Sequence, residues 1–310
     1  PFYIGATGGL GEGSANNLSR DTDLALAIGT KLADFTTASW TNFQNENFKL
    51  VSVNTSRFDT VKHRAFPVVS DAKIGLKELS KALGDWKAPN GWYQRAIEEK
   101  NKWEEYVAKE SGPTNQELPS YAHAVGAVYR NSDPSDIVVT AAGGLVGEVV
   151  QIWKPKEINT FETEWGFSCM GYEISGALGI KMAKPDQDVV VFVGDGSYLL
   201  QNSDIYSSVL YDKKLIIVVC DNGGHMVINR LQLAKGGKEY LCNLNAAGAT
   251  NLQFVDFEAH AKSMGANAET VKSTSELEAA FKRAKASDKT YVISMKTDGY
   301  EWLEGTAFWD

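Results

Sequence analysis

The chain has 310 residues, of which 43% are hydrophobic and 23% are charged, and its formal net charge is −8. This apolar content is enough to bury a core, and the length accommodates two domains. The acidic excess argues against nucleic acid or an anionic membrane surface as the main partner, and no run of about eighteen apolar residues is present that would cross a bilayer.

The first part of the chain, residues 1–84, has the pattern of an α/β domain. Residues 23–29 and 49–54 are short apolar runs typical of buried strands, and residues 71–83 carry apolar side chains at helical spacing. The glycine-rich segment 8–13 follows no clear strand and lacks the spacing of a dinucleotide-binding fingerprint. We therefore interpret it as a flexible loop.

Residues 85–117 are predicted to form a helical linker, and residues 118–310 a second domain. In the linker, a charged helix over 92–110 precedes a Gly- and Pro-containing break. Strands and helices alternate in the second domain, which predicts parallel strands with helices on both faces. The expected class is α/β, with two doubly wound parallel-sheet domains. Expected strands of the second domain are 137–140, 188–194, 214–222, 269–272 and 290–295; expected helices are 119–130, 173–183, 198–211, 254–264 and one with a capping-box start at 275–278.

The most informative motif is Gly194-Asp195-Gly196-Ser197, followed by Asn222 at the end of the next apolar run. The two runs and the helix between them predict a β-α-β unit. Its strands carry a carboxylate and a carboxamide at their carboxyl ends, where open α/β sheets bind ligands. Oxygen ligands from Asp195, Asn222 and the backbone carbonyl of Gly224 suit Mg²⁺.

Glycine turns at the same edge predict an anion site. Gly196 and Ser197 would open a helix whose free N–H groups and dipole favour negative charge. Gly143-Gly144 closes the strand 137–140. It is either an ordinary tight turn or a place where the backbone approaches a diphosphate. We favour the second interpretation, because two glycine turns would then converge on one anion.

At these residues the chain resembles the thiamine diphosphate-dependent enzymes, whose signature is Gly-Asp-Gly, a gap of this length and a metal-binding Asn. The sequence departs from the usual Asn-Asn pair by having Asp221 before Asn222. The resemblance implies thiamine diphosphate and Mg²⁺ as cofactors. It implies metal ligation by Asp195, Asn222 and Gly224, and cofactor contacts from Gly143, Gly144, Ser168, Met170, Gly194, Gly196, Ser197 and Asn222.

The segment 165–172 extends the resemblance. In the family, a bulky apolar residue before a Gly lies beneath the cofactor, and Met170 before Gly171 occupies that position. The resemblance implies that the Ser168 carbonyl and the Met170 N–H bind the aminopyrimidine ring. The alternative is that Met170 only fills the core.

The resemblance also implies a further domain. Residues 1–84 are similar to the C-terminal part of the family's central domain, and residues 118–310 to its diphosphate-binding domain. The pyrimidine-binding domain, which supplies the activating Glu, would lie before Pro1, and both ends look like cuts through a longer protein. We therefore expect the chain to be inactive alone and to need that domain from the same or a neighbouring subunit, in a homodimer or homotetramer.

Two segments, 162–176 and 220–232, are similar to the family branch that hydrolyses a carbon–carbon bond of a polyhydroxylated cyclic dione, giving 5-deoxy-glucuronate in myo-inositol breakdown. Acetolactate-synthase-like members typically have Gly-Leu-Pro where this chain has Glu173-Ile174-Ser175. A carboligase or decarboxylase of 2-oxo acids is the alternative activity. A cofactor-binding or regulatory subunit without its own activity is the alternative outside enzymes.

His225 is the candidate catalytic residue, because it follows the metal-binding Asn222 by three positions and its imidazole suits proton transfer. It would otherwise bind a substrate hydroxyl or have no role. A rim of His225, Asn229, Arg230 and Gln232 fits a polyhydroxylated substrate, although these residues are equally compatible with structural roles.

The remaining polar residues have ordinary interpretations. His63, His123 and His260 are expected on helices or the surface, and Glu162 and Glu164 in a solvated turn rather than as an acid–base pair. The three cysteines, Cys169, Cys220 and Cys242, are not closely paired, so neither a disulfide framework nor a zinc site is indicated and a cytoplasmic location is expected.

Overall fold

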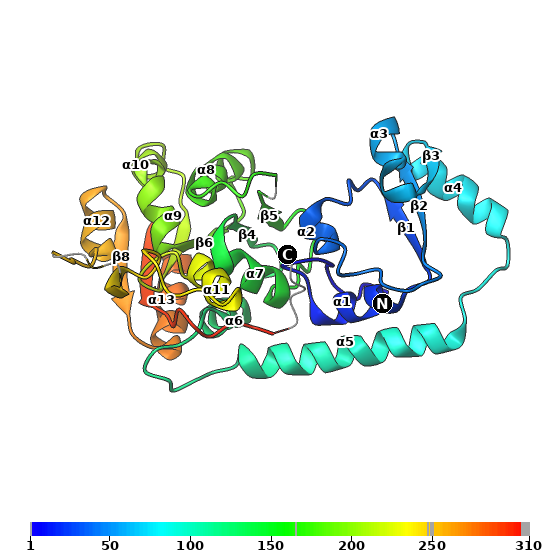
Figure 1. Ribbon diagram of the computed structural model, residues 1–310. Coiled ribbons are helices and arrows are strands. Elements are labelled where there is room, and N and C mark those ends of the chain that lie inside the picture. Colours follow the sequence, from blue (N-terminus) through cyan, green and yellow to red (C-terminus); the bar gives the residue numbers. More distant parts are fainter. Residues whose placement is uncertain (1, 165, 247, 249–250, 305–310) are drawn as a thin grey trace. The chain divides into compact units, whose positions relative to one another are not determined.

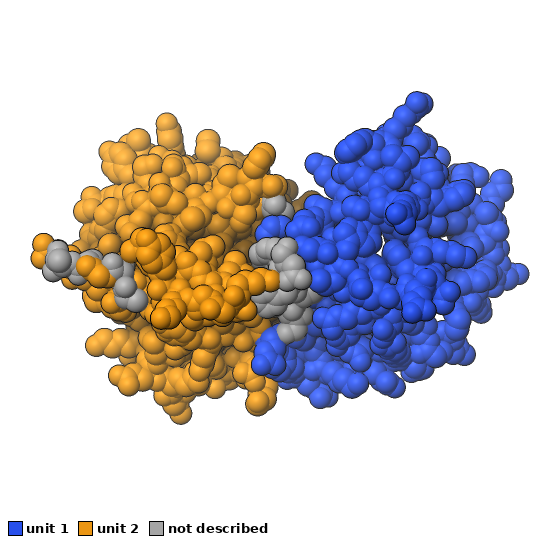
Figure 2. All heavy atoms as spheres, viewed as in Figure 1, with its two compact units in different colours: residues 1–107, 304–310 blue, residues 108–303 orange. Residues whose placement is uncertain are grey.

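A computed structural model describes residues 2–164, 166–246, 248 and 251–304. Trp165, which belongs to the segment leading to Met170, lies outside the described residues. The chain divides into two compact units, unit 1 (residues 1–107 and 304–310) and unit 2 (residues 108–303) (Figure 2). The division falls inside the segment 85–117, while the domain boundaries drawn from the sequence remain predictions.

Unit 1 contains a small parallel sheet of three strands in the order β1-β2-β3. Ala27 on β1 and Leu50 and Val53 on β2 are buried, whereas Leu24 and Leu26 on β1 are exposed. The strands are β1 (Leu24–Ile28), β2 (Lys49–Asn54) and β3 (Phe66–Val69), and the helices are α1 (Gly13–Asp21), α2 (Asp34–Thr37), α3 (Arg57–Thr60), the 3₁₀ turn η1 (Lys62–Arg64), α4 (Ala72–Leu83) and the start of α5 (Asn90–Glu110).

The glycine-rich segment of unit 1, interpreted from the sequence as a flexible loop, is a buried, hydrogen-bonded loop that leads into helix α1, which the sequence pattern did not predict. The N–H of Gly8 donates to Asn16 Oδ1 and the Asn16 side chain donates back to the Gly8 carbonyl. Gly8 has φ +110°, and a Cβ there would lie 1.9 Å from the carbonyl oxygen of Phe35. Close backbone packing, not a dinucleotide fingerprint, therefore accounts for this glycine.

Unit 2 contains a parallel sheet of six strands in the order β5-β4-β6-β7-β9-β8. Its strands are β4 (Ile137–Thr140), β5 (Phe161–Thr163), β6 (Val189–Gly194), β7 (Ile216–Asp221), β8 (Asn267–Val271) and β9 (Tyr291–Lys296); its helices are α6 (Tyr121–Arg130), α7 (Gly143–Ile152), α8 (Tyr172–Ala183), α9 (Asp195–Leu200), α10 (Ser203–Leu210), α11 (Met226–Ala234), the 3₁₀ turn η2 (Leu244–Ala246), α12 (Phe257–Ser263) and α13 (Thr274–Ala286). The predicted α/β class with parallel sheets is confirmed.

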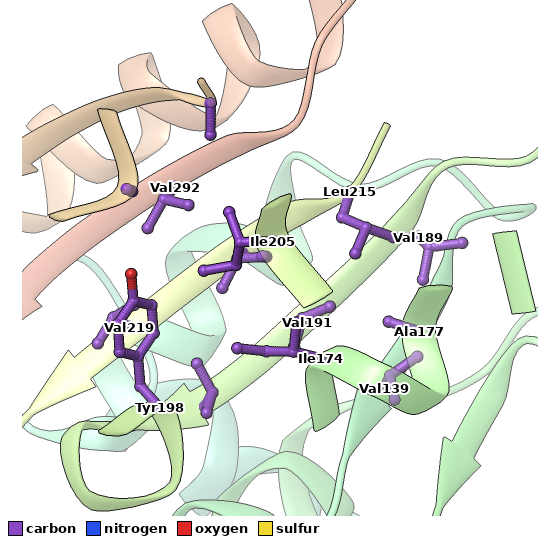
Figure 3. Packing of buried hydrophobic residues seen from close by; sticks show 14 of the residues in the cluster. Val139, Ile174, Ala177, Val189, Val191, Tyr198, Ile205, Leu215, Val219 and Val292 are labelled. Carbon is purple, nitrogen blue, oxygen red and sulfur yellow. The ribbon is translucent and has the colours of Figure 1, made fainter. Parts of the chain in front are cut away.

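Helices cover both faces of the six-stranded sheet (Figure 1). Alternate strand residues such as Val139, Val191 and Val219 face the layer of α8, α9, α10 and α12, where they pack with Ile174 and Tyr198 (Figure 3). On the other face lie α6, α7 and α13. Because β6 and β7 are buried on both faces, they are continuous apolar runs, as parallel strands require.

Two local predictions were wrong in detail. The expected single helix over 198–211 is two helices, α9 and α10, and α9 begins at Asp195 itself. Helix α13 is capped by Ser273, whose hydroxyl accepts from the N–H of Glu276, while the Glu276 carboxylate accepts from the N–H of Lys272, the residue before the cap. A Ser and a Glu at the same spacing lie two residues further on, so the pattern alone selected the later pair.

Among the helices that the structure describes, none combines the length and the apolar character needed to cross a membrane.

Candidate functional site

The carboxyl ends of β6 and β7 bring the two central motif residues to one edge of the sheet. The strands pair in parallel, with Gly194 opposite Cys220, so Asp195 and Asn222 both follow directly from this pairing. Asp195 is only 5% exposed. Burial, and then the nearby charge of Asp221, raise the pKa of Asp195 to about 6, although backbone N–H groups of Gly196 and Gly224 act in the opposite direction. A carboxylate in this setting is stabilised by a cation.

Asn222 supplies the second candidate ligand. Its Oδ1 atom is buried and has no hydrogen-bond partner among the described residues. A buried polar atom without a partner costs free energy unless a ligand satisfies it. An aspartate carboxylate and an asparagine carbonyl together form the oxygen donor set that Mg²⁺ uses. The residues present therefore fit a divalent cation.

Asp221 is turned away from this role. Its Oδ1 accepts from the N–H of Gly223 at 3.0 Å, and its Oδ2 forms an ion pair with Lys296. The carboxylate thus closes the loop after β7 and is compensated by a lysine. In the described parts of the chain, no three His, Cys, Asp or Glu residues are grouped as metal ligands, so a cation at this edge would depend on Asn222 and the backbone in addition to Asp195.

The loop that carries Asn222 is fixed by a second segment of the chain. The N–H of His225 donates to the Cys242 carbonyl at 2.7 Å, and the N–H of Leu244 donates to the Gly223 carbonyl at 3.0 Å. Gly224 has φ +148°, and a Cβ there would lie 2.2 Å from the Cys242 oxygen. A glycine is therefore required at the position whose carbonyl is the predicted third metal ligand.

Two predicted site residues from different loops, His225 and Met170, adjoin Gly196 in the first turn of α9. A Cβ on Gly196 would lie 2.8 Å from Cε1 of His225 and 3.3 Å from Cε of Met170. His225 is exposed, and Met170 is 36% exposed. The exposure of Met170 does not support the core-filler alternative, while its role beneath a cofactor remains a prediction.

The loop before Met170 is held by Glu164. Its Oε1 accepts from the N–H of Phe167 and its Oε2 from the N–H of Cys169, both at 2.8 Å. Ser168 within this loop has φ +52°, and its hydroxyl donates to the Ala141 carbonyl at 3.5 Å. Glu164 is thus a loop-bracing residue, and Glu162 lies on β5.

The glycine pair at the end of β4 starts helix α7. Gly143 has φ +79° with open space around it, whereas a Cβ on Gly144 would lie 2.0 Å from Cζ3 of Trp302. Packing against an indole ring is a structural reason for Gly144 that the sequence did not reveal. Approach of a diphosphate to Gly143 and Gly144 remains a prediction.

Several rim candidates have protein partners. Asn229 is buried and donates to Glu239 Oε1 at 2.7 Å, and the Gln232 side chain bonds the backbone of Tyr240. The Arg230 guanidinium lies over the Trp302 ring, 5.2 Å from its centroid. These contacts favour structural roles for Asn229 and Gln232.

The other histidines lie on helices or at the surface, as expected. His63 is exposed, His123 caps α6 together with Ser120, and His260 accepts or donates at Nδ1 to the Tyr198 hydroxyl at 2.9 Å. Cys169, Cys220 and Cys242 are free thiols.

Glu173 was not among the site residues predicted from the sequence. Its carboxylate is 1% exposed and accepts from the N–H groups of Ala142 and Gly171. A carboxylate in the first turn of the otherwise largely apolar helix α8 was the available signal.

Comparison with known protein families assigns a class to this arrangement. The sequence model of "Thiamine pyrophosphate enzyme, C-terminal TPP binding domain" matches residues 141–295, and that of "Thiamine pyrophosphate enzyme, central domain" matches residues 1–79. The chain belongs to the thiamine pyrophosphate enzymes. The match to the TPP binding domain implies thiamine diphosphate as the cofactor of this fold.

Among curated proteins, the chain is similar to several that are named 3D-(3,5/4)-trihydroxycyclohexane-1,2-dione hydrolase. It is 34% identical over 329 residues to the protein of Halalkalibacterium halodurans, covering 96% of this chain and 51% of that protein. It is 36% identical over 330 residues to that of Listeria innocua, covering 99% and 51%, and 33% identical over 336 residues to that of Bacillus subtilis, covering 98% and 52%. The chain thus spans about half the length of the curated relatives that it matches.

Proposed function

We propose that the chain is part of a thiamine diphosphate- and Mg²⁺-dependent hydrolase that opens the ring of 3D-(3,5/4)-trihydroxycyclohexane-1,2-dione to 5-deoxy-glucuronate in myo-inositol degradation. The observation that carries the cofactor proposal is the buried, unpartnered Asn222 Oδ1 at the same sheet edge as the buried Asp195 carboxylate. The substrate proposal is supported by the names of the relatives.

In this proposal, Asp195, Asn222 and the Gly224 carbonyl hold Mg²⁺, which offsets the charge of the diphosphate. Gly194, Gly196 and Ser197 at the start of α9, with Gly143 and Gly144 at the start of α7, face the diphosphate. The chemistry that bound thiamine diphosphate supplies is a nucleophilic carbon able to add to a carbonyl group.

The residues around Gly196 are proposed to orient the reacting parts. Met170 would support the cofactor from below, and the backbone of Ser168 and Met170 would bind its pyrimidine ring. His225, which is exposed and adjoins Gly196, would move protons during carbon–carbon cleavage and hydration.

We propose that a pyrimidine-binding domain of the same or a neighbouring subunit completes the site. This is supported by the coverage of about half of the relatives' length and by exposed apolar side chains beside the site. Phe167 is 91% exposed, Leu199 49% and Leu200 63%. A contiguous apolar patch formed by such residues would be a surface that another domain covers. The assembly would be a homodimer or homotetramer, and light scattering of the full-length protein tests it.

The substitution Asp195→Ala in the full-length protein tests the cofactor proposal. We expect Mg²⁺-dependent binding of thiamine diphosphate to be lost in isothermal titration. Asp186→Ala is the control, because Asp186 is an exposed carboxylate before the amino end of β6. Unchanged affinity in Asp195→Ala would contradict the metal assignment.

Product analysis tests the reaction. The full-length protein should convert the cyclic dione to the ring-opened acid. Release of carbon dioxide from pyruvate without turnover of the dione would instead support a carboligase or decarboxylase of 2-oxo acids.

A further inference from the structure

Glu173 lies on the first turn of α8 and its carboxylate is almost completely buried, at 1% exposed. Its two oxygens accept hydrogen bonds from different parts of the chain. Oε1 accepts from the N–H of Ala142 at 3.2 Å, and Oε2 accepts from the N–H of Gly171 at 2.8 Å. The hydroxyl of Ser197 is a third group that acts on this carboxylate, where it lowers the pKa of Glu173 against the effect of burial.

Each of these groups belongs to a different segment of the proposed cofactor site. Ala142 immediately precedes Gly143 at the start of α7, Gly171 immediately follows Met170, and Ser197 lies in α9 after the Gly194-Asp195-Gly196 turn. One side chain therefore joins three segments that are far apart in the sequence. Ala142 is 31 positions from Glu173.

Helix capping alone does not explain this arrangement. The bond from Gly171 is local and satisfies an N–H at the start of α8, as a capping residue would. The bond from Ala142 satisfies an N–H of another helix, α7, for which no capping side chain is present. Because the Glu173 carboxylate accepts hydrogen bonds from the starts of both α7 and α8, it fixes the position of these two helix starts relative to each other.

The carboxylate is itself held rigidly. Ile174 and Ala177 on the same helix are fully buried in the core between α8 and the sheet (Figure 3). Burial raises the pKa of Glu173, and the backbone and hydroxyl donors act against that rise. The donors are thus held in place by a buried side chain on a rigid element.

We infer that Glu173 is a positioning residue, which fixes the start of α7, the Met170 loop and Ser197 relative to one another. The inference rests on the proposed function, because these three segments are the ones proposed to contact thiamine diphosphate. Glu173 is not proposed to touch the cofactor. Its effect would be to hold backbone N–H groups where the diphosphate and the pyrimidine ring need them.

The test compares Glu173→Ala and Glu173→Gln with a matched control in the full-length protein. Asp136→Asn is the control, because Asp136 is also a buried carboxylate, 3% exposed, but lies before the amino end of β4, where it binds Lys285. Two quantities are measured: hydrogen exchange of the Ala142 and Gly171 amides, and the affinity for thiamine diphosphate in the presence of Mg²⁺.

In Glu173→Ala we expect both amides to exchange at least about tenfold faster and the affinity to fall on the order of tenfold, as when a supporting residue behind a ligand is lost. In Glu173→Gln, one acceptor oxygen remains, so the effect should be smaller. In Asp136→Asn, the exchange at these two amides and the affinity should stay as in the wild type. Glu173→Gln keeps the side-chain shape and decides the question if Glu173→Ala does not fold.

Unchanged exchange at both amides in the Glu173 variants would overturn the inference, and so would an equal loss of affinity in Asp136→Asn. Faster exchange with unchanged affinity would refute the link to cofactor binding. A wild-type protein that binds no thiamine diphosphate would instead contradict the proposed function, while the exchange rates would still decide whether Glu173 fixes the loops.

Discussion

The backbone of Gly196 adjoins the imidazole ring of His225, and a Cβ at position 196 would lie 2.8 Å from Cε1 of that ring. Gly196 lies just after the carboxyl end of β6, and His225 lies in the loop after β7. This contact therefore depends on the parallel pairing of the two strands. The same Cβ would crowd Met170. The glycine of the motif is therefore the residue around which the predicted catalytic and cofactor-supporting side chains are arranged.

Gly196→Ala should displace His225 and Met170. We expect the affinity for thiamine diphosphate with Mg²⁺ to fall at least about tenfold, because the added Cβ would displace the site residues by roughly an ångström. Isothermal titration of the full-length protein measures the loss. Gly179→Ala is the control: Gly179 lies inside α8 with open space around it, so Ala should stabilise the protein by about 0.5–1 kcal/mol without changing the affinity. Wild-type affinity in Gly196→Ala would contradict the proposed arrangement.

His225→Ala should lower kcat for the cyclic dione on the order of a hundredfold, which is the usual contribution of general acid–base catalysis. The affinity for thiamine diphosphate should hold, because the ring is exposed and is not among the proposed metal ligands. Steady-state kinetics of the full-length enzyme separate the possibilities. A change confined to KM would make His225 a substrate-binding residue, and wild-type kinetics would remove it from the mechanism. His63→Ala, an exposed histidine of unit 1, is the control.

Gly144→Ala distinguishes two reasons for the glycine at the start of α7. A Cβ there would overlap the Trp302 ring, so the substitution should destabilise unit 2 by about 1–3 kcal/mol, the typical cost of overpacking. The double variant Gly144→Ala/Trp302→Ala removes the overlap. If diphosphate contact is a further reason for the glycine, the cofactor affinity of the double variant should remain below that of Trp302→Ala alone. Equal affinities would assign Gly144 to packing only.

Glu148 should make the stability of unit 2 dependent on pH. It is 3% exposed, and burial raises its pKa from 4.5 to about 7, against the opposing effects of the Leu303 N–H and Arg230. Because the folded state holds the proton more tightly than the unfolded state, the stabilising contribution is present below pH 4.5 and is lost as the pH rises through 7. The shift corresponds to about 3 kcal/mol.

Glu148→Gln removes this titration while keeping the shape of the side chain. Between pH 4.5 and pH 8, the free energy of unfolding should change in both proteins, but the wild type should lose about 3 kcal/mol more than the variant. Denaturant unfolding at several pH values measures the difference, in which contributions common to both proteins cancel. Parallel curves for the two proteins would show that Glu148 does not titrate in this range.

The sequence by itself determined the elements that depend on local pattern. The continuous apolar runs of β6 and β7 predicted strands buried on both faces, and the Gly-Asp-Gly turn with Asn222 placed a candidate metal site at their carboxyl ends. These features follow from the period of hydrophobic residues and from strand direction, and both can be read along the chain.

Only the tertiary structure decided which residues meet across loops. Distant segments meet in the hydrogen bond between Glu173 and Ala142 and in the packing of Trp302 against Gly144. The tertiary structure also leaves the buried Oδ1 of Asn222 without a hydrogen-bond partner among the described residues. No local pattern encodes such contacts, because they depend on strand order and on how each loop returns over the sheet edge. The same reason explains why helix α1 was not predicted. Asn16 on this helix and Gly8 in the preceding loop form hydrogen bonds with each other, and such a contact, unlike a hydrophobic period, cannot be read from the sequence.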